Sequence, residues 1–203
     1  MLTSSRALRG FSLIELMVTL GVAALLLLAA VPAMQSWVAD ARVRTAAESF
    51  QNAARLAQGE AMRRSRTAVL VLTDSSPTLA ATPAAGGQRW IVRLIERSVD
   101  DGAEDSLFVR GGGEAAAGGV TVQGSALTCF NAFGQLTTLS SQATGLDAEC
   151  EAPTSSTANE FVFSRDGGRS LKVLISRGGQ VRLCDAQKTF SDDHPDGCPS
   201  AAS

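Results

Sequence analysis

Residues 10–20 read GFSLIELMVTL, and this stretch decides how the rest of the chain is interpreted. A small residue, Gly10, directly precedes an apolar run, and the carboxylate of Glu15 lies inside that run. Between Arg9 and Asp40, Glu15 is the only charged side chain. An ionised group inside an apolar segment is energetically costly, so its presence here indicates a function.

The apolar run covers residues 11–31, and we expect it to form a transmembrane helix. At about 1.5 Å per residue, it is long enough to span a hydrocarbon core of about 30 Å. A secretory signal peptide is an alternative, with Arg6 and Arg9 as its basic end. A plain signal anchor is another. Neither explains why Gly10, the small residue suited to cleavage, precedes the run, or why Glu15 lies in its first turn.

Pro32 interrupts the apolar pattern and is expected to kink the helix, which then continues over residues 32–66 as an amphipathic helix ending near Arg66. An apolar stripe recurs there at alternating steps of four and three residues, and most of the arginines lie off it. The stripe consists of Val43, Ala47, Phe50, Ala54, Ala57 and Ala61. A stripe of alanines lets another part of the protein approach the helix closely.

Residues 67–203 carry short apolar or alternating runs that predict strands. These are Ala68–Thr73, Trp90–Glu96, Leu107–Val109, Val120–Val122, Ala126–Phe130, Phe161–Ser164, Leu171–Ser176 and Gln180–Cys184. We expect a loop over residues 75–88, flexible low complexity over residues 111–119, and a hairpin turn at Asp166-Gly167. The fold class is therefore α+β: a long N-terminal helix packed on an antiparallel β-rich C-terminal domain.

Composition and residue inventory argue against an enzyme. The formal net charge is -2, from 18 basic and 20 acidic side chains, so no overall excess points to nucleic acid or to disorder. His194 is the only histidine, and no Ser/His/Asp or Cys/His arrangement can be assembled around it. Asp192 and Asp193 precede it, but further metal ligands at suitable spacing are absent. We expect no catalysis, no cofactor and no metal.

The four cysteines are Cys129, Cys150, Cys184 and Cys198, which allow three pairings. Nearest-neighbour pairing would close two short loops. Outside the cytoplasm each disulfide would add about 2–4 kcal/mol of stability. A four-cysteine zinc site is the rival interpretation, but such sites usually contain Cys-x-x-Cys pairs, and none occurs here.

The stretch at residues 10–20 resembles the prepilin signal of type IV pilins and type II secretion pseudopilins. The resemblance implies a leader of residues 1–10, which a prepilin peptidase removes by cutting between Gly10 and Phe11 before Phe11 is N-methylated. It also implies that Glu15, the fifth residue after the cut, pairs with the N-terminal amine of a neighbouring subunit. A carboxylate in lipid needs such a partner. The alternative is a Glu15 side chain that reaches the headgroups from the first turn.

The rest of the chain resembles the GspH/FimT-type branch of these proteins. The resemblance rests on the helix ending before a strand near Ala68, on FNAFG at residues 130–134, and on GQVRLCD at residues 179–185. It implies a pilin-like fold. The terminal cysteines, Cys184 and Cys198, resemble the disulfide-closed tail of FimT- and FimU-like minor pilins. From the order of the cysteines and a location outside the cytoplasm, we expect Cys129 to pair with Cys150 and Cys184 with Cys198.

The implied function is that of a non-catalytic minor pilin or pseudopilin that primes or caps assembly of a type IV pilus. A minor pseudopilin of a type II secretion system is the alternative. The implied partners are a prepilin peptidase and other pilins, which the N-terminal helix contacts. The implied location is the inner membrane, as a single-pass protein with its C-terminal domain in the periplasm, and the pilus or cell surface after assembly.

Some members of the FimT branch bind DNA through a Gly-Arg-x-Arg motif at this C-terminal strand. Gly179 and Arg182 fit that motif, but Gln180 stands where its first arginine belongs. Arg177 and Arg182 are candidates for a weak, salt-sensitive contact with phosphate. The competing interpretation is that they are solvated charges on an exposed sheet.

Overall fold

The computed structural model describes residues 11–95, 107–112, 119–154 and 157–199, with the backbone alone over residues 29–33. The helices are α1 (Leu13–Arg64) and α2 (Ser141–Thr144). The strands are β1 (Ala68–Thr73), β2 (Arg89–Leu94), β3 (Phe108–Gly112), β4 (Thr121–Gln123), β5 (Leu127–Phe130), β6 (Ala158–Ser164), β7 (Leu171–Ser176), β8 (Val181–Thr189) and β9 (Gly197–Cys198). The predicted leader, including Gly10, lies outside the described residues.

The chain divides into two compact units, Met1–Val38 and Ala39–Ser203. In the first unit, large apolar side chains are exposed from Phe11 to Leu28. Four of them follow one another directly, at residues 25–28, so they point to every side of the helix. Among the residues that the structure describes, no helix has the combined length and apolarity of a membrane span.

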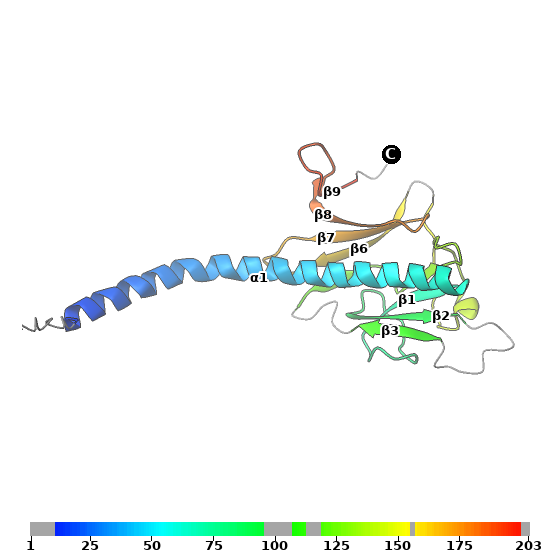
Figure 1. Cartoon of the computed structure of the whole chain (residues 1–203), viewed down its shortest axis with the longest axis horizontal. Coiled ribbons are helices and arrows are strands. Elements are labelled where there is room, and N and C mark those ends of the chain that lie inside the picture. The colour runs from blue at the N-terminus through cyan, green and yellow to red at the C-terminus, as the bar shows by residue number, and fades with distance from the viewer. Residues whose placement is uncertain (1–10, 96–106, 113–118, 155–156, 200–203) are drawn as a thin grey trace, which may run out of the picture. The chain divides into compact units, whose positions relative to one another are not determined.

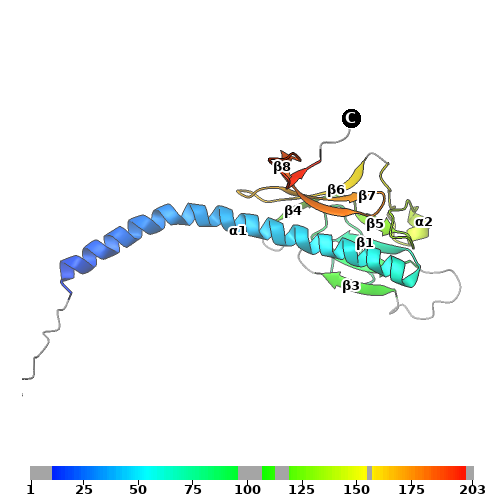
Figure 2. The same ribbon diagram turned by 45° about the horizontal axis from the view of Figure 1, so that its top comes forward.

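In the second unit the strands form two sheets. Their strand orders are β3-β2-β1-β5 and β4-β6-β7-β8-β9. Neighbouring strands are antiparallel except for β8 and β9, which pair in parallel. Figures 1 and 2 show the C-terminal part of α1 running along both sheets.

One hydrophobic core joins α1 to both sheets. All six residues of the predicted helix stripe are fully buried in it. Phe50 lies at its centre, with its ring 4.4 Å from that of Phe161 and 5.5 Å from that of Phe163 on β6. The stripe was predicted from periodicity alone, and this burial confirms it.

Strand β1 is buried on both faces and separates this core from a second one. Leu70 and Leu72 face α1, whereas Val69 and Val71 face a smaller cluster on the opposite side of the sheet. That cluster is covered by the segment that contains α2, which lies near β5 (Figure 2). Residues that alternate between two buried faces explain why β1 reads as an unbroken apolar run in the sequence.

Each predicted strand overlaps an observed one, and the bounds of β1 and β7 are those expected. The Asp166-Gly167 turn joins β6 to β7, with Gly167 at a φ of 75°. The largest difference is β8, which continues to Thr189 instead of ending at Cys184 because β9 pairs with its second half. Neither α2 nor β9 was predicted, since four and two residues are too few to show a period. The expected strand end at Glu96 and most of the low-complexity segment lie outside the described residues.

Candidate functional site

The first turns of α1 carry Glu15, the residue expected to act in assembly. Its side chain is exposed, as are those of its neighbours Ile14 and Leu16. The helix is already regular here, since the Leu16 amide donates to the Ser12 carbonyl at 3.2 Å. Within residues 11–28, Glu15 is therefore the one charged side chain, and it lies on a largely apolar helix surface.

Two disulfides hold the second unit, Cys129–Cys150 and Cys184–Cys198. Cys129 lies on β5, and both residues of the first disulfide are at most 1% exposed, inside the smaller core. The second joins β8 to β9, and its Cys198 is only partly buried. The first disulfide is therefore internal, whereas the second closes a surface loop.

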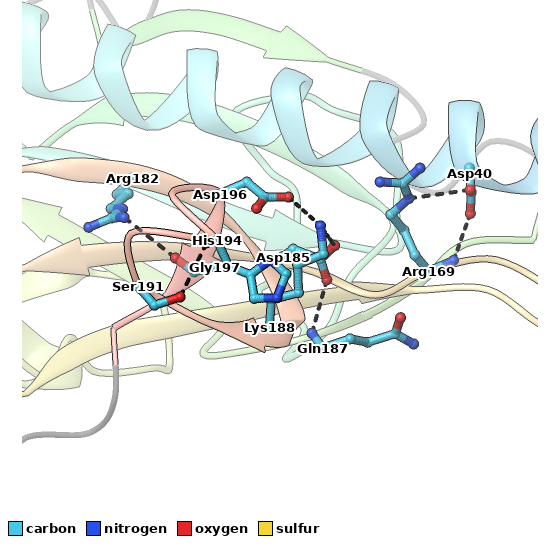
Figure 3. Close-up of polar contacts among 10 residues, drawn as sticks. All are labelled: Asp40, Arg169, Arg182, Asp185, Gln187, Lys188, Ser191, His194, Asp196 and Gly197. Atoms are coloured by element: carbon cyan, nitrogen blue, oxygen red, sulfur yellow. Dashed lines mark hydrogen bonds and ion pairs between the residues drawn. The ribbon is translucent and has the colours of Figure 1, made fainter.

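That surface loop, residues 185–197, is also held by ion pairs and backbone contacts (Figure 3). Lys188 Nζ lies 2.7 Å from Asp196 Oδ2 and 3.8 Å from Asp185 Oδ2. The hydrogen bond from Lys188 lowers the pKa of Asp196, and the same bond raises the pKa of Lys188. A Cβ on Gly197 would lie 2.5 Å from the Thr189 carbonyl carbon, so only glycine fits where β9 meets β8.

Arg182, one of the two candidate DNA contacts, is engaged by the tail. Its guanidinium carbon lies 4.8 Å from the centre of the Phe190 ring. Its Nη2 donates to the Gly197 carbonyl at 3.4 Å (Figure 3). Arg177, the other candidate, has an exposed side chain in the turn between β7 and β8. The two arginines therefore stand in different environments: Arg177 is exposed, whereas Arg182 is partly buried against the tail.

Asp40 on α1 binds the turn that joins β6 to β7. Its carboxylate accepts hydrogen bonds from the Arg169 backbone amide at 2.7 Å and from Arg169 Nε at 3.3 Å (Figure 3). The amide bond is the main cause of the lowered pKa of Asp40; burial opposes it and the guanidinium adds to it. Gly168 packs closely here, because a Cβ on it would lie 3.2 Å from that of Ala39.

Among the residues that the structure describes, no three His, Cys, Asp or Glu side chains lie close enough together to bind a metal ion. His194 is exposed, and its backbone amide donates to Ser191 Oγ at 3.2 Å. It lies in the Cys184–Cys198 loop, where its backbone forms part of a turn with Ser191 (Figure 3).

Comparison with known families settles what kind of protein this is. Residues 46–192 match the family described as Type II transport protein GspH, and residues 6–31 match the prokaryotic N-terminal methylation motif. The chain belongs to the GspH family. It is therefore a minor pilin or pseudopilin of the type IV pilus and type II secretion families, a structural subunit without catalysis, and its fold is the pilin-like α+β fold.

The methylation motif implies that a prepilin peptidase processes this GspH-family chain, and family membership implies membrane anchoring and assembly with other pilins. Among solved structures, the chain is similar to the type IV minor pilin FimU of Pseudomonas aeruginosa strain PAO1 in two crystal forms. Both matches have 16% identity and a TM-score of 0.46. They cover 72% and 71% of this chain and 90% and 94% of FimU. No curated protein matches at a significant level.

Several contacts of the GspH-family chain were not anticipated from sequence. Asp40 was noted only as the first charge after the apolar run, and its partner Arg169 lies 129 residues away. Likewise, nothing in the spacing of Arg182 and Phe190 indicated that the aromatic ring would cover the guanidinium. The Asp40–Arg169 pair depends on where α1 meets the turn between β6 and β7, and the Arg182–Phe190 pair depends on how the tail folds back against β8. The sequence pattern supplies neither.

Proposed function

We propose that this chain is a minor pilin that primes or caps assembly of a type IV pilus. It is anchored in the inner membrane by a single helix over residues 11–31, with its C-terminal domain in the periplasm. Its partners are the prepilin peptidase, which cuts between Gly10 and Phe11, and other pilins. After assembly the domain is carried into the pilus.

The observation that carries this proposal is the exposed apolar surface of the first unit. Large side chains there are 52–84% exposed from Phe11 to Leu28, on every side of the helix. A helix that is apolar all round is stable only in lipid or inside a helix bundle. A pilin subunit meets both environments, first the membrane and then the packed centre of a filament.

Glu15 gives this surface its specificity. In lipid or in a helix bundle its carboxylate needs a positive partner, and the methylated amine of Phe11 on a neighbouring subunit would provide one. Pairing between subunits would set the axial offset between adjacent helices. The surrounding apolar side chains would then supply the area buried by assembly.

The Cys184–Cys198 loop favours a pilus over a secretion system. A disulfide-closed tail is typical of FimT- and FimU-like minor pilins, whereas secretion pseudopilins of this branch commonly lack it. A minor pseudopilin of a type II secretion system is the alternative function. DNA capture ranks third, because Gln180 departs from the arginine motif and the tail beyond it is acidic.

The experiment removes the chain from cells that make both pili and a type II secretion system. We expect far fewer pili by electron microscopy, with restoration by the wild-type chain and not by Glu15→Leu. The chain itself should occur in sheared pili at low copy number. Normal pili together with retained secretion substrates would instead assign the chain to the secretion system, and no change in either would contradict both assignments.

A further inference from the structure

The turn after β5 presents an exposed phenylalanine that the proposed function does not use. Phe133 is 82% exposed. Met62 on α1 is 48% exposed and lies beside the same turn, since a Cβ on Gly134 would come within 2.9 Å of its sulfur. Single exposed apolar residues are ordinary on protein surfaces, so exposure alone assigns nothing. What distinguishes Phe133 is how firmly its backbone is held.

The Asn131 side chain organises the turn from inside. Its Oδ1 accepts hydrogen bonds from the Phe133 amide at 2.9 Å and from the Gln135 amide at 3.0 Å. The Asn131 amide in turn donates to the Gln135 carbonyl at 2.8 Å. Gly134 completes the turn with a φ of 75°, a conformation that other residues rarely adopt.

Gln58 then fixes the turn to α1. Its Nε2 donates to the carbonyls of Gly134, at 2.8 Å, and of Gly179, at 3.0 Å. The turn between β7 and β8 is joined as well, because the Leu136 amide donates to the Arg177 carbonyl at 2.9 Å. An aromatic side chain on such a fixed backbone loses little conformational entropy on binding, which is typical of residues that dominate protein interfaces.

The charges around Phe133 indicate what it would bind. Residues 130–136 carry no charge, and the described charges next to them are mainly arginines. Arg63 follows Met62 directly in α1. The Arg177 side chain is exposed in the turn between β7 and β8, whose backbone accepts a hydrogen bond from Leu136. Glu60, which lies on α1 within one turn of Met62, pairs with both Arg63, at 2.6 Å, and Arg64, at 2.9 Å, so this group of three side chains keeps one positive charge in excess. A complementary surface therefore has an apolar pocket with carboxylates at its rim.

We propose that Phe133 and Met62 form a contact site for a neighbouring subunit of the same filament, which receives the Phe133 ring in an apolar pocket bordered by Asp or Glu. The inference rests on the proposed function, because it takes the partner from the filament. It adds a second contact, made by the folded domain, to the one made by the N-terminal helices. Arg63 and Arg177 orient the encounter by attraction to the carboxylate rim.

The test uses full-length chains in cells that assemble the filament, and it measures the amount of each variant in sheared filaments relative to membranes. Phe133→Ser should lower this ratio about tenfold, and Arg177→Glu should lower it by several-fold. Phe133→Leu keeps apolar bulk and should retain most of the wild-type ratio. The matched control is Gln135→Ala, which changes an exposed side chain on the same turn and should leave the ratio unchanged.

A photoreactive phenylalanine analogue at position 133 identifies the partner. We expect one adduct with a pilin-type subunit, mapped to a segment that contains carboxylates and lost with Arg177→Glu. If Phe133→Ser matches Gln135→Ala, the contact site is wrong while the proposed function stands. If the control is itself absent from filaments, the proposed function fails. An adduct with nucleic acid, or loss of the contact in Phe133→Leu, would mean that Phe133 stacks on nucleic-acid bases and does not enter a protein pocket.

Discussion

At the scale of single residues, the Asp40 carboxylate links α1 to the β6–β7 turn through its hydrogen bonds with Arg169. Asp40 is the second residue of the second unit, next to Ala39, which packs against Gly168 of the same turn. Since the Arg169 amide donates to it, the pKa of Asp40 lies below its ordinary value of 3.8. The folded state therefore favours the ionised form.

Replacing Asp40 should make the domain less stable in a pH-dependent way. A carboxyl whose pKa is lowered by folding stabilises the protein above its ordinary pKa, and this contribution is lost as the pH falls through the lowered value. We expect Asp40→Asn to cost about 0.5–1 kcal/mol at pH 7, and the difference from wild type to be lost as the pH falls below 3.8 and through the lowered pKa of Asp40. Urea denaturation of a fragment that begins at Gln35 measures it. The control is Glu160→Gln, which breaks the exposed pair with Lys172 and should change stability less.

DNA binding is a second question that single side chains decide. The soluble fragment should bind double-stranded DNA weakly, because Gln180 replaces an arginine and the tail carries Asp192, Asp193 and Asp196. Arg177→Ala should lower any residual affinity and reduce the salt slope by about 0.9. Gln180→Arg should raise the affinity. Tight binding by the wild type at physiological salt, lost in Arg177→Ala, would make DNA capture the main function.

At the scale of elements, the sequence predicts what depends on local periodicity. The burial of Phe50 and its alanine neighbours, and the hairpin at Gly167, follow from spacing and turn chemistry alone. The division of the strands into two sheets does not, since several pairings of short strands bury the same side chains. The contacts of Gln58 were likewise out of reach, because its two acceptors lie 76 and 121 residues away.

The two disulfides should differ in how fast reductant reaches them, because one lies at the surface and the other in the core. Cys198 is partly exposed, whereas Cys129 and Cys150 are buried beneath the sheet. Mild reductant followed by alkylation and peptide mapping should modify Cys184 and Cys198 first and leave the domain folded. Cys129 and Cys150 should react only on unfolding, and replacing both by alanine should cost about 2–4 kcal/mol.

The urea-unfolded protein is the control, in which all four cysteines should be alkylated together. Alkylation of Cys129 and Cys150 ahead of the tail pair would contradict the assignment of the first disulfide to the core. It would mean that the segment carrying α2 opens before the Cys184–Cys198 loop does.

At the scale of the whole molecule, the two units have opposite characters. The second has its own core, two sheets and two disulfides, so folding alone accounts for its burial. In the part of the first unit that the structure describes, the large apolar side chains from Phe11 to Leu28 are exposed. A helix surface that is apolar on every side is stable only in lipid or inside a helix bundle. We expect cleavage next to Phe11 to prepare the N-terminus for that environment.

The proposed filament function depends most directly on the identity of the mature N-terminus. Mass spectrometry of the chain extracted from membranes of cells with a working prepilin peptidase should find N-methylated Phe11 as the first residue. Gly10→Leu should block the cut and leave the full-length chain in the membrane. A wild-type chain that remains uncut, or one cleaved after the apolar run near Ala30, would contradict the assignment of this protein as a pilin-type filament subunit.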